Sequence, residues 1–255
     1  ERVRQSDDMF EVIAEGDLLL HHPFESFAPF IDFLRQAADD PAVLAIRQTL
    51  YRTGTESAVV EALTRAALEG KEVLVVIELR ARFDEEANIE LANHLQKAGA
   101  QVVYGVVGHK THAKMSMVIR REGRSLKRYV HLGTGNYHSR TTRLYTDYGL
   151  FTCNDEIGQD VQQLFQQLTS MGRTRRLKTL LQSPFTLHKT RAHPGVLLRE
   201  RRSEALHVQR RLDGPQLLQP GGDLLPGPRP EAGHPCAARS SALSRRQLPG
   251  LGPAE

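Results

Sequence analysis

His112 and Lys114 stand two residues apart and form the pair in this sequence best suited to chemistry on a phosphate group. A neutral imidazole nitrogen can attack a phosphoryl group and carry it covalently. A fixed ammonium beside the imidazole stabilises the charge that develops on the phosphate oxygens. An isolated pair of this kind is also common on strand surfaces, so its meaning depends on the residues around it.

The run from Lys114 to Ile119 begins with alternating polar and apolar residues, which is typical of a half-buried strand. Side chains two apart on a strand share a face. We therefore expect His112, Lys114 and Ser116 to point the same way and the intervening methionines to face the core.

A glycine-rich turn, Gly-Thr-Gly-Asn at residues 133–136, follows further along the chain. Its glycines would let backbone amides approach an anion, although most turns of this kind are ordinary tight turns. Between Lys110 and Arg143 there are nine Lys or Arg residues and one acid, Glu122. This part of the chain would attract a polyanion, and a solvated basic surface is the alternative interpretation.

The elements that must hold these residues are predicted to alternate between helices and strands. For the helix predicted at 56–68, Thr55 is the expected N-cap and Gly70 the expected C-terminal cap. The order is typical of an α/β fold, and we expect a mixed, largely parallel sheet flanked by helices. The predicted elements are a helix at 24–38, a strand at 43–51, a helix at 56–68, a strand at 73–79, a helix at 85–98, a strand at 101–104 and, later, a helix at 155–171.

Composition sets outer limits on the function. The chain is 40% hydrophobic, and no apolar run is long enough to cross a membrane. Two cysteines are too few for a disulfide framework, which favours a reducing, cytoplasmic setting. The net charge is +4, but residues 1–190 hold 24 basic and 24 acidic residues, so the excess lies beyond them. The charge is therefore weak support for nucleic-acid binding, and we predict none.

Residues 191–255 differ sharply in composition from the rest of the chain. They hold nine of the 13 prolines and no Ile, Phe, Tyr, Lys, Thr, Asn or Met. A segment with so little to bury is expected to be disordered. Arginine without lysine, together with much Pro, Gly and Ala, is what GC-rich DNA gives when it is read in the wrong frame. We therefore infer a frameshift near residue 190.

Five motifs, in the same order along the chain, resemble those of the bacterial ATP-dependent polyphosphate kinases. The resemblance runs from residue 8 to residue 190. A His-x-Lys pair followed by a glycine-rich turn ending in Asn is also the pattern of the phospholipase D superfamily, so the resemblance implies a phospholipase D-like fold. The motifs are IRQTLYR at 46–52, ELRARFDEEAN at 78–88, KTHAK at 110–114, HLGTGN at 131–136 and TRLYTD at 142–147.

The resemblance implies that His112, supported by Lys114, takes the γ-phosphoryl group of ATP as a phosphohistidine. Arg52 and Arg82 match two arginines at a Mg²⁺–phosphate site. A guanidinium only donates hydrogen bonds, so these arginines would grip phosphate oxygens that also hold the metal. Tyr145 matches a tyrosine that contacts the nucleotide. Further supporting roles are implied for Asn136, Arg143 and Asp147.

The implied activity is the reversible transfer of phosphoryl groups between ATP and inorganic polyphosphate, with Mg²⁺ as cofactor. The full-length enzyme would be a homo-oligomer, cytoplasmic or membrane-associated. We expect the end of a preceding segment at 1–22, the phospholipase D-like catalytic domain at 23–182, the start of a second catalytic domain at 183–190, and the tail at 191–255. Without that second domain we expect this chain alone to be an inactive fragment.

Two other functions are compatible with parts of the pattern. The first is a phospholipase D-type phosphodiesterase, a class that usually has an Asp five residues after the motif lysine. Ile119 occupies that position here, which argues against this class. The second is a non-catalytic module that binds polyanions, and binding without turnover would distinguish it from a kinase.

Overall fold

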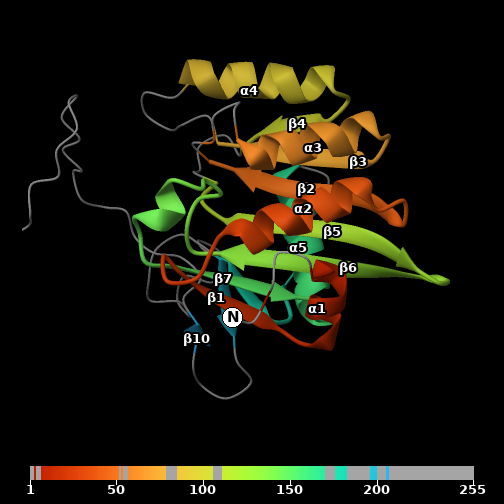
Figure 1. Ribbon diagram of the computed structural model, residues 1–255, viewed down its shortest axis with the longest axis vertical. Helices are drawn as coiled ribbons and strands as arrows, with labels where there is room; N and C mark the ends of the chain where they lie inside the picture. Colours follow the sequence, from red (N-terminus) through yellow and green to blue (C-terminus); the bar gives the residue numbers. More distant parts are fainter. Residues whose placement is uncertain are drawn as a thin grey trace, which may run out of the picture. The chain divides into compact units, whose positions relative to one another are not determined.

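The computed structural model (Figure 1) describes most of the chain up to residue 182 and two short stretches beyond it. By its internal contacts the chain divides into residues 1–212 and 213–255, and every described residue belongs to the first unit. No helix among the described residues is long and apolar enough to cross a membrane. The described residues are Val3, 7–51, 53, 57–78, 85–105, 111–169, 176–182, 196–199 and 205–206.

A seven-stranded sheet forms the centre of the first unit. Its spatial order is β1 (Leu18–His22), β7 (Asp147–Thr152), β6 (Ser125–Gly133), β5 (Lys114–Glu122), β2 (Val43–Leu50), β3 (Glu72–Ile77) and β4 (Gln101–Tyr104). The helices are α1 (Met9–Glu15), α2 (Ala28–Asp39), α3 (Ala58–Leu68), α4 (Glu85–Lys97) and α5 (Asp155–Leu168), with a short 3₁₀ turn η1 (Thr141–Arg143).

The mixed α/β fold is confirmed, but the expectation that its sheet is largely parallel is wrong. Only β2, β3 and β4 run parallel, joined by the crossover helices α3 and α4. The other four pairings are antiparallel. For the β5–β6 pairing the physical reason is the tight turn between the two strands, in which Gly123 has φ +60°. A turn this short can join only antiparallel neighbours.

Helices cover both faces of the sheet, as Figure 1 shows for α2 and α3 on one side and α5 on the other. The core under α1 to α4 includes Phe33, Leu63 and Val118, and the core under α5 includes Met117 and Phe165. Each of these side chains is fully buried and stabilises the fold by about 1.5–3 kcal/mol.

β5 is therefore buried on both faces rather than half-buried. Met115 and Met117 face the α5 core as expected, whereas Val118 faces the opposite core and Ser116 is 0% exposed. The alternation in the sequence suggested a solvent face, but β5 is a central strand with helices on both sides.

The ends of α3 test the capping predictions. Gly70 has φ +79°, and the backbone amides of Gly70 and Lys71 donate to the carbonyls of Ala67 and Ala66. This is the expected glycine C-terminal cap. The predicted N-cap at Thr55 is wrong, because α3 begins at Ala58 and the Ser57 side chain accepts from the Val59 amide.

Residues 7–22, which were predicted to be the end of a preceding segment, contribute to the large sheet and to one of its cores. β1 pairs with β7 over its whole length, and Phe10 of α1 packs against Tyr129 with ring centroids 4.9 Å apart. These residues complete the sheet edge and one of its cores.

A second, three-stranded sheet follows the α5 helix. It contains β8 (Leu180–Gln182), β9 (Val196–Arg199) and β10 (Ala205–Leu206), in the order β10-β9-β8. β9 and β10 lie within the segment predicted to be disordered, so that prediction does not hold for these six residues. The remainder of 191–255 lies outside the described residues.

Candidate active site

Strand ends from distant parts of the chain meet at one edge of the large sheet. β2 and β3 finish there at Leu50 and Ile77, which are paired in register. β5 runs antiparallel to β2 and starts at Lys114, directly opposite Gly133 at the end of β6. β7 starts nearby at Asp147. The edge therefore gathers the motifs that are separated in sequence.

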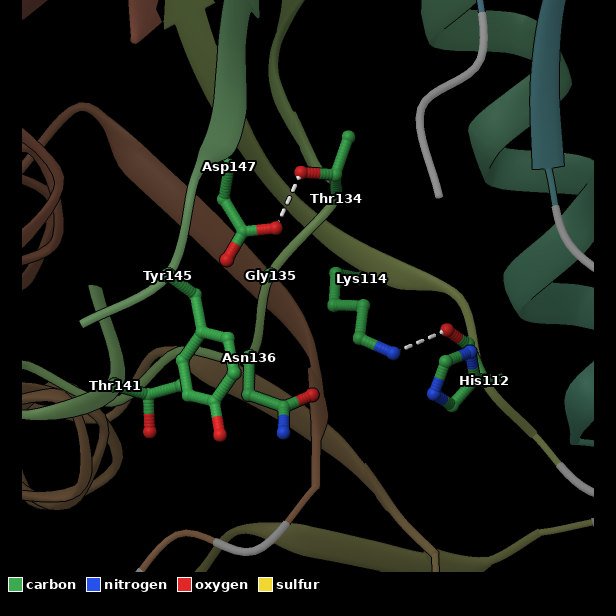
Figure 2. A pocket seen from close by; sticks show the side chains of 8 residues that line it. All are labelled: His112, Lys114, Thr134, Gly135, Asn136, Thr141, Tyr145 and Asp147. Atoms are coloured by element: carbon green, nitrogen blue, oxygen red, sulfur yellow. Dashed lines mark hydrogen bonds between the residues drawn. The ribbon is translucent and has the colours of Figure 1, made fainter. Parts of the chain in front are cut away.

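A pocket lies at this edge, and Figure 2 shows its lining. Asn136 and Tyr145 lie on one side of the pocket, and His112 and Lys114 lie on the other. The lining residues are His112, Lys114, Thr134, Gly135, Asn136, Thr141, Tyr145 and Asp147.

The lysine of the pair is almost buried. Lys114 is 5% exposed, and its Nζ donates to the His112 carbonyl oxygen at 2.7 Å. The same Nζ lies 5.3 Å from the centroid of the Tyr51 ring, within the range of a cation–π contact. His112 itself is half-buried and precedes the strand, because β5 begins at Lys114. The start of β5 at Lys114 is the start that the alternating run predicted.

Tyr51 has no role predicted from the sequence, although this residue contacts both members of the pair. Its ring meets the His112 imidazole edge-to-face, with centroids 5.5 Å apart and an interplanar angle of 85°. The one signal in the sequence is that Tyr51 lies in the motif 46–52, at the end of a predicted strand.

The backbone on either side of His112 is held by side chains from β2 and from the end of β3. Thr49 Oγ1 donates to the Ala113 carbonyl at 2.8 Å and accepts from the Met115 amide at 2.9 Å. The Glu78 carboxylate accepts from the Thr111 amide at 2.5 Å. These contacts take over where the regular β2–β5 pairing stops.

The glycine-rich turn is fastened to the start of β7. Thr134 Oγ1 donates to Asp147 Oδ1 at 2.8 Å and accepts from the Tyr148 amide at 2.9 Å. A Cβ on Gly135 would overlap the Asp147 carboxylate, which explains why glycine is needed at this position. Asn136 is 8% exposed, and its Oδ1 has no hydrogen-bond partner among the described residues. A buried polar atom that lacks a partner and faces a pocket is suited to a ligand.

The remaining predicted site residues fall into two groups. Tyr145 lines the pocket, and its amide donates to the Thr141 carbonyl at 3.1 Å. Arg143 is exposed on η1 and does not line the pocket. Arg52 and Arg82 lie outside the described residues, so their predicted roles remain predictions.

A second histidine, His131, lies fully buried near the glycine-rich turn. Burial, and to a smaller extent the neighbouring His22, lower its pKa to about 3. Its ring packs against Phe30 and Phe151, and its Nδ1 is 3.0 Å from the Tyr137 hydroxyl. A neutral imidazole enclosed by aromatic rings has a structural role, and it leaves His112 as the histidine that faces the pocket.

The described residues contain no group of three or more His, Cys, Asp or Glu side chains that could hold a metal ion. The pocket lining includes one carboxylate, Asp147, and the amide oxygen of Asn136. Mg²⁺ often binds through one or two carboxylates, several waters and the phosphates of a substrate. These donors therefore fit a magnesium ion that arrives with a phosphate ligand.

Comparisons with known proteins agree on one family. The family profile described as "Polyphosphate kinase C-terminal domain 1" matches residues 8–174. Polyphosphate kinase of Xylella fastidiosa (strain Temecula1) is 64% identical over 197 residues, which are 77% of this chain and 28% of that protein. The corresponding protein of Pseudomonas syringae pv. tomato is 60% identical over 187 residues, 73% of this chain and 25% of its own length.

A solved structure agrees with these relatives. The crystal structure of polyphosphate kinase from Porphyromonas gingivalis superimposes with a TM-score of 0.62 at 36% identity, covering 69% of this chain and 30% of that one. The chain thus spans between 25% and 30% of the length of these three proteins.

Proposed function

The chain belongs to the polyphosphate kinase family, and on that premise we propose that it carries the domain that accepts the γ-phosphoryl group of ATP on His112. The phosphoryl group then passes to a growing inorganic polyphosphate chain. The observation that supports this most directly is the pocket in which the half-buried imidazole of His112 lies beside the buried ammonium of Lys114.

The phosphoryl group is transferred in two steps. The lone pair of a neutral His112 ring nitrogen attacks the γ-phosphorus, a P–N bond forms, and the P–O bond to ADP breaks as ADP leaves with the electron pair. A terminal oxygen of polyphosphate then attacks the phosphohistidine, which restores the imidazole and lengthens the polymer by one unit. Both steps are reversible, so polyphosphate and ADP can also give ATP.

The other pocket residues act on charge and position. Lys114 neutralises charge on the transferred group, and Asn136 donates its amide N–H to a phosphate oxygen. Tyr145 contacts the nucleotide. Arg52 and Arg82 bind phosphate oxygens, with bidentate geometry as the physical reason for arginine. Arg143 lies outside the pocket lining, so it would contact a part of the polyanion that extends beyond the pocket. Mg²⁺ bound through phosphate oxygens would supply further neutralisation of charge.

The phosphodiesterase alternative is disfavoured by one observation. Ile119, which stands where that class usually has an Asp, packs against the apolar core under α5. A non-catalytic polyanion-binding surface is also less well supported. Arg120 and Lys127 pair with Asp40 and Glu122 at the far end of the β5–β6 hairpin, so these two residues of the basic run are neutralised by acids and lie away from the pocket.

The test is covalent labelling in a chimera, defined as the Xylella fastidiosa enzyme with its matching stretch replaced by residues 8–174 of this chain. With γ-labelled ATP, label should appear on His112 as a phosphoramidate, stable to base and labile to acid. The same protein with His112→Ala should carry no label, because the attacking atom is gone. Label that persists after this substitution would show that another residue is the carrier.

The same proposal includes the organisation of the longer protein. We propose that residues 183–190 open a second catalytic domain, that residues 191–255 follow a frameshift, and that the full-length enzyme is a homo-oligomer, cytoplasmic or membrane-associated. Sequencing the gene across codons 185–195 tests the frameshift, which requires a homologous continuation in another reading frame.

A further inference from the structure

Two residues without an assigned role contact the segment that carries His112. Tyr51 follows the end of β2, and Glu78 follows the end of β3, so both lie at the sheet edge where the pocket is found. Tyr51 is 9% exposed and Glu78 is 3% exposed. A buried phenol and a buried carboxylate each lose hydration, which costs free energy. Contacts with other groups must offset this cost.

Glu78 holds the backbone one residue before His112. Its Oε2 accepts from the Thr111 amide at 2.5 Å, a charge-assisted hydrogen bond. A Cβ on Gly105 would come within 2.7 Å of Thr111 Oγ1 and 3.3 Å of Glu78 Oε2, so the three groups are closely packed. The backbone of Thr111 is thereby fixed, and the starting direction of the His112 side chain is fixed with it.

Tyr51 restrains the reactive groups themselves. Its ring meets the imidazole of His112 at 85°, while Lys114 Nζ lies over the same ring. One rigid side chain therefore touches both the nucleophile and the cation. An edge-to-face contact disfavours rotation of the imidazole about its χ angles, which reduces the ordering that would otherwise be required when the phosphoryl donor binds.

We propose that Tyr51 and Glu78 are positioning residues that hold His112 in line for phosphoryl transfer, Tyr51 through its ring and Glu78 through the Thr111 amide. The inference rests on the proposed function of His112 as the phosphoryl carrier. It predicts that removing either contact slows the attack by His112 while leaving ATP binding nearly unchanged.

The contacts are tested first in the 255-residue chain by NMR. The carbon-bound ring protons of His112 should show a ring-current shift that Tyr51→Leu removes and Tyr51→Phe keeps. The Thr111 amide should exchange slowly with solvent. We expect its exchange to become at least tenfold faster in Glu78→Leu and to change less in Glu78→Gln, which retains an acceptor oxygen. Random-coil shifts of His112 and rapid exchange of Thr111 in the unsubstituted chain would overturn the inference.

The consequence for catalysis is tested in the chimera. Single-turnover labelling of His112 at saturating ATP should be about 10- to 100-fold slower in Tyr51→Leu and Glu78→Leu, the size of effect that a misplacement of about 1 Å produces. The ATP concentration for half-maximal rate should stay within about threefold, because these side chains act on orientation rather than on binding. Tyr51→Phe should restore the rate, since it returns the ring without the hydroxyl.

The results of these experiments separate the two proposals. No label in the unsubstituted chimera overturns the function proposed for His112, even if both NMR contacts are present. Normal labelling rates in both leucine variants overturn the positioning inference and leave the function intact. If a leucine variant fails to fold, the labelling rates of Tyr51→Phe and Glu78→Gln are compared with that of the unsubstituted chimera. The inference then expects Tyr51→Phe to lose no more rate than Glu78→Gln. A larger loss in Tyr51→Phe than in Glu78→Gln also contradicts the inference.

Discussion

The β5–β6 hairpin ends in two different environments. At its turn, ionic groups pair with one another: Arg120 Nε binds Asp40 Oδ2 at 2.7 Å, and Glu122 accepts from Arg120 and from the Tyr129 hydroxyl. Burial acts to raise the pKa of Asp40 and of Glu122, but these hydrogen bonds and the nearby cations outweigh it, so both pKa values are lowered. Burial and the adjacent Glu122 raise the pKa of Tyr129.

At the open end of the hairpin, Lys114 and Asn136 line the pocket. Lys114 Nζ donates to a carbonyl and lies over Tyr51, and Asn136 presents a buried oxygen to the pocket. Basic residues therefore have different roles at the turn and at the open end of the hairpin. The paired charges at the turn stabilise the fold, whereas Lys114 lies in the lining of the pocket, where its ammonium can meet an anionic ligand.

The largest expected effect comes from removing the lysine at the open end. Lys114→Met in the chimera should lower the rate of phosphoryl transfer by about 100- to 1,000-fold, the usual loss for one electrostatic stabiliser of a transition state. Lys127→Met makes the same change near the hairpin turn and should leave the rate within about twofold, because Lys127 pairs with Glu122 far from the pocket. Equal losses of rate in the two variants would show that the two ends of the hairpin do not differ in their effect on phosphoryl transfer.

The next effect concerns the predicted phosphate-binding arginines. Arg52→Lys or Arg82→Lys in the chimera should slow the reaction by about tenfold or more, since loss of a charge-assisted contact costs about 1.5–3 kcal/mol. Lysine keeps the charge but lacks the planar fork. Arg121→Lys, on the exposed hairpin, is the matched control. Steady-state rates within twofold of the unsubstituted protein would place Arg52 and Arg82 outside the site.

At the hairpin turn we expect stability to change and catalysis to stay constant. Asp40→Ala removes the acceptor for Arg120 and for the Ala42 amide, so the free energy of unfolding should fall by about 1–3 kcal/mol. Asp39→Ala removes the exposed pair with Arg65, which should cost no more than about 1 kcal/mol. Urea unfolding of the 255-residue chain measures both. A larger loss for Asp39 than for Asp40 would contradict the assignment.

A further comparison is the difference in acid sensitivity between the two ends. Because the pKa of His131 is about 3 when folded and about 6.5 when unfolded, the unfolded chain binds the extra proton between these values. The contribution of His131 to the free energy of unfolding is complete above pH 6.5 and falls by about 1.4 kcal/mol per pH unit as the pH drops toward 3. Asp40 and Glu122 have lowered pKa values, so their contribution is kept down to their unfolded pKa values and lost below them.

Urea titrations at several pH values separate these contributions. His131→Leu should flatten the slope of unfolding free energy between pH 6.5 and 5, while His94→Gln, at an exposed position on α4, should leave it unchanged. A slope that survives in His131→Leu would show that other groups dominate this pH range.

The amino-acid sequence by itself determined much of the candidate site. His112, Lys114, Asn136 and Tyr145 were identified from motifs, and all four line one pocket. The parallel part of the sheet and the glycine cap at Gly70 were also predictable. The site residues were marked by their resemblance to family motifs. The helices, strands and caps were predictable because periodicity, turns and caps depend on residues close together in the chain.

Tertiary structure alone decided the antiparallel half of the sheet, the burial of both faces of β5, and the contacts that Tyr51, Thr49 and Glu78 make with the His112 segment. Thr49 reaches Ala113 across 64 residues, and Glu78 reaches Thr111 across 33. No local pattern specifies such partners. They are selected because β2, β5 and α5 together bury far more apolar surface in this arrangement than any one segment could bury alone.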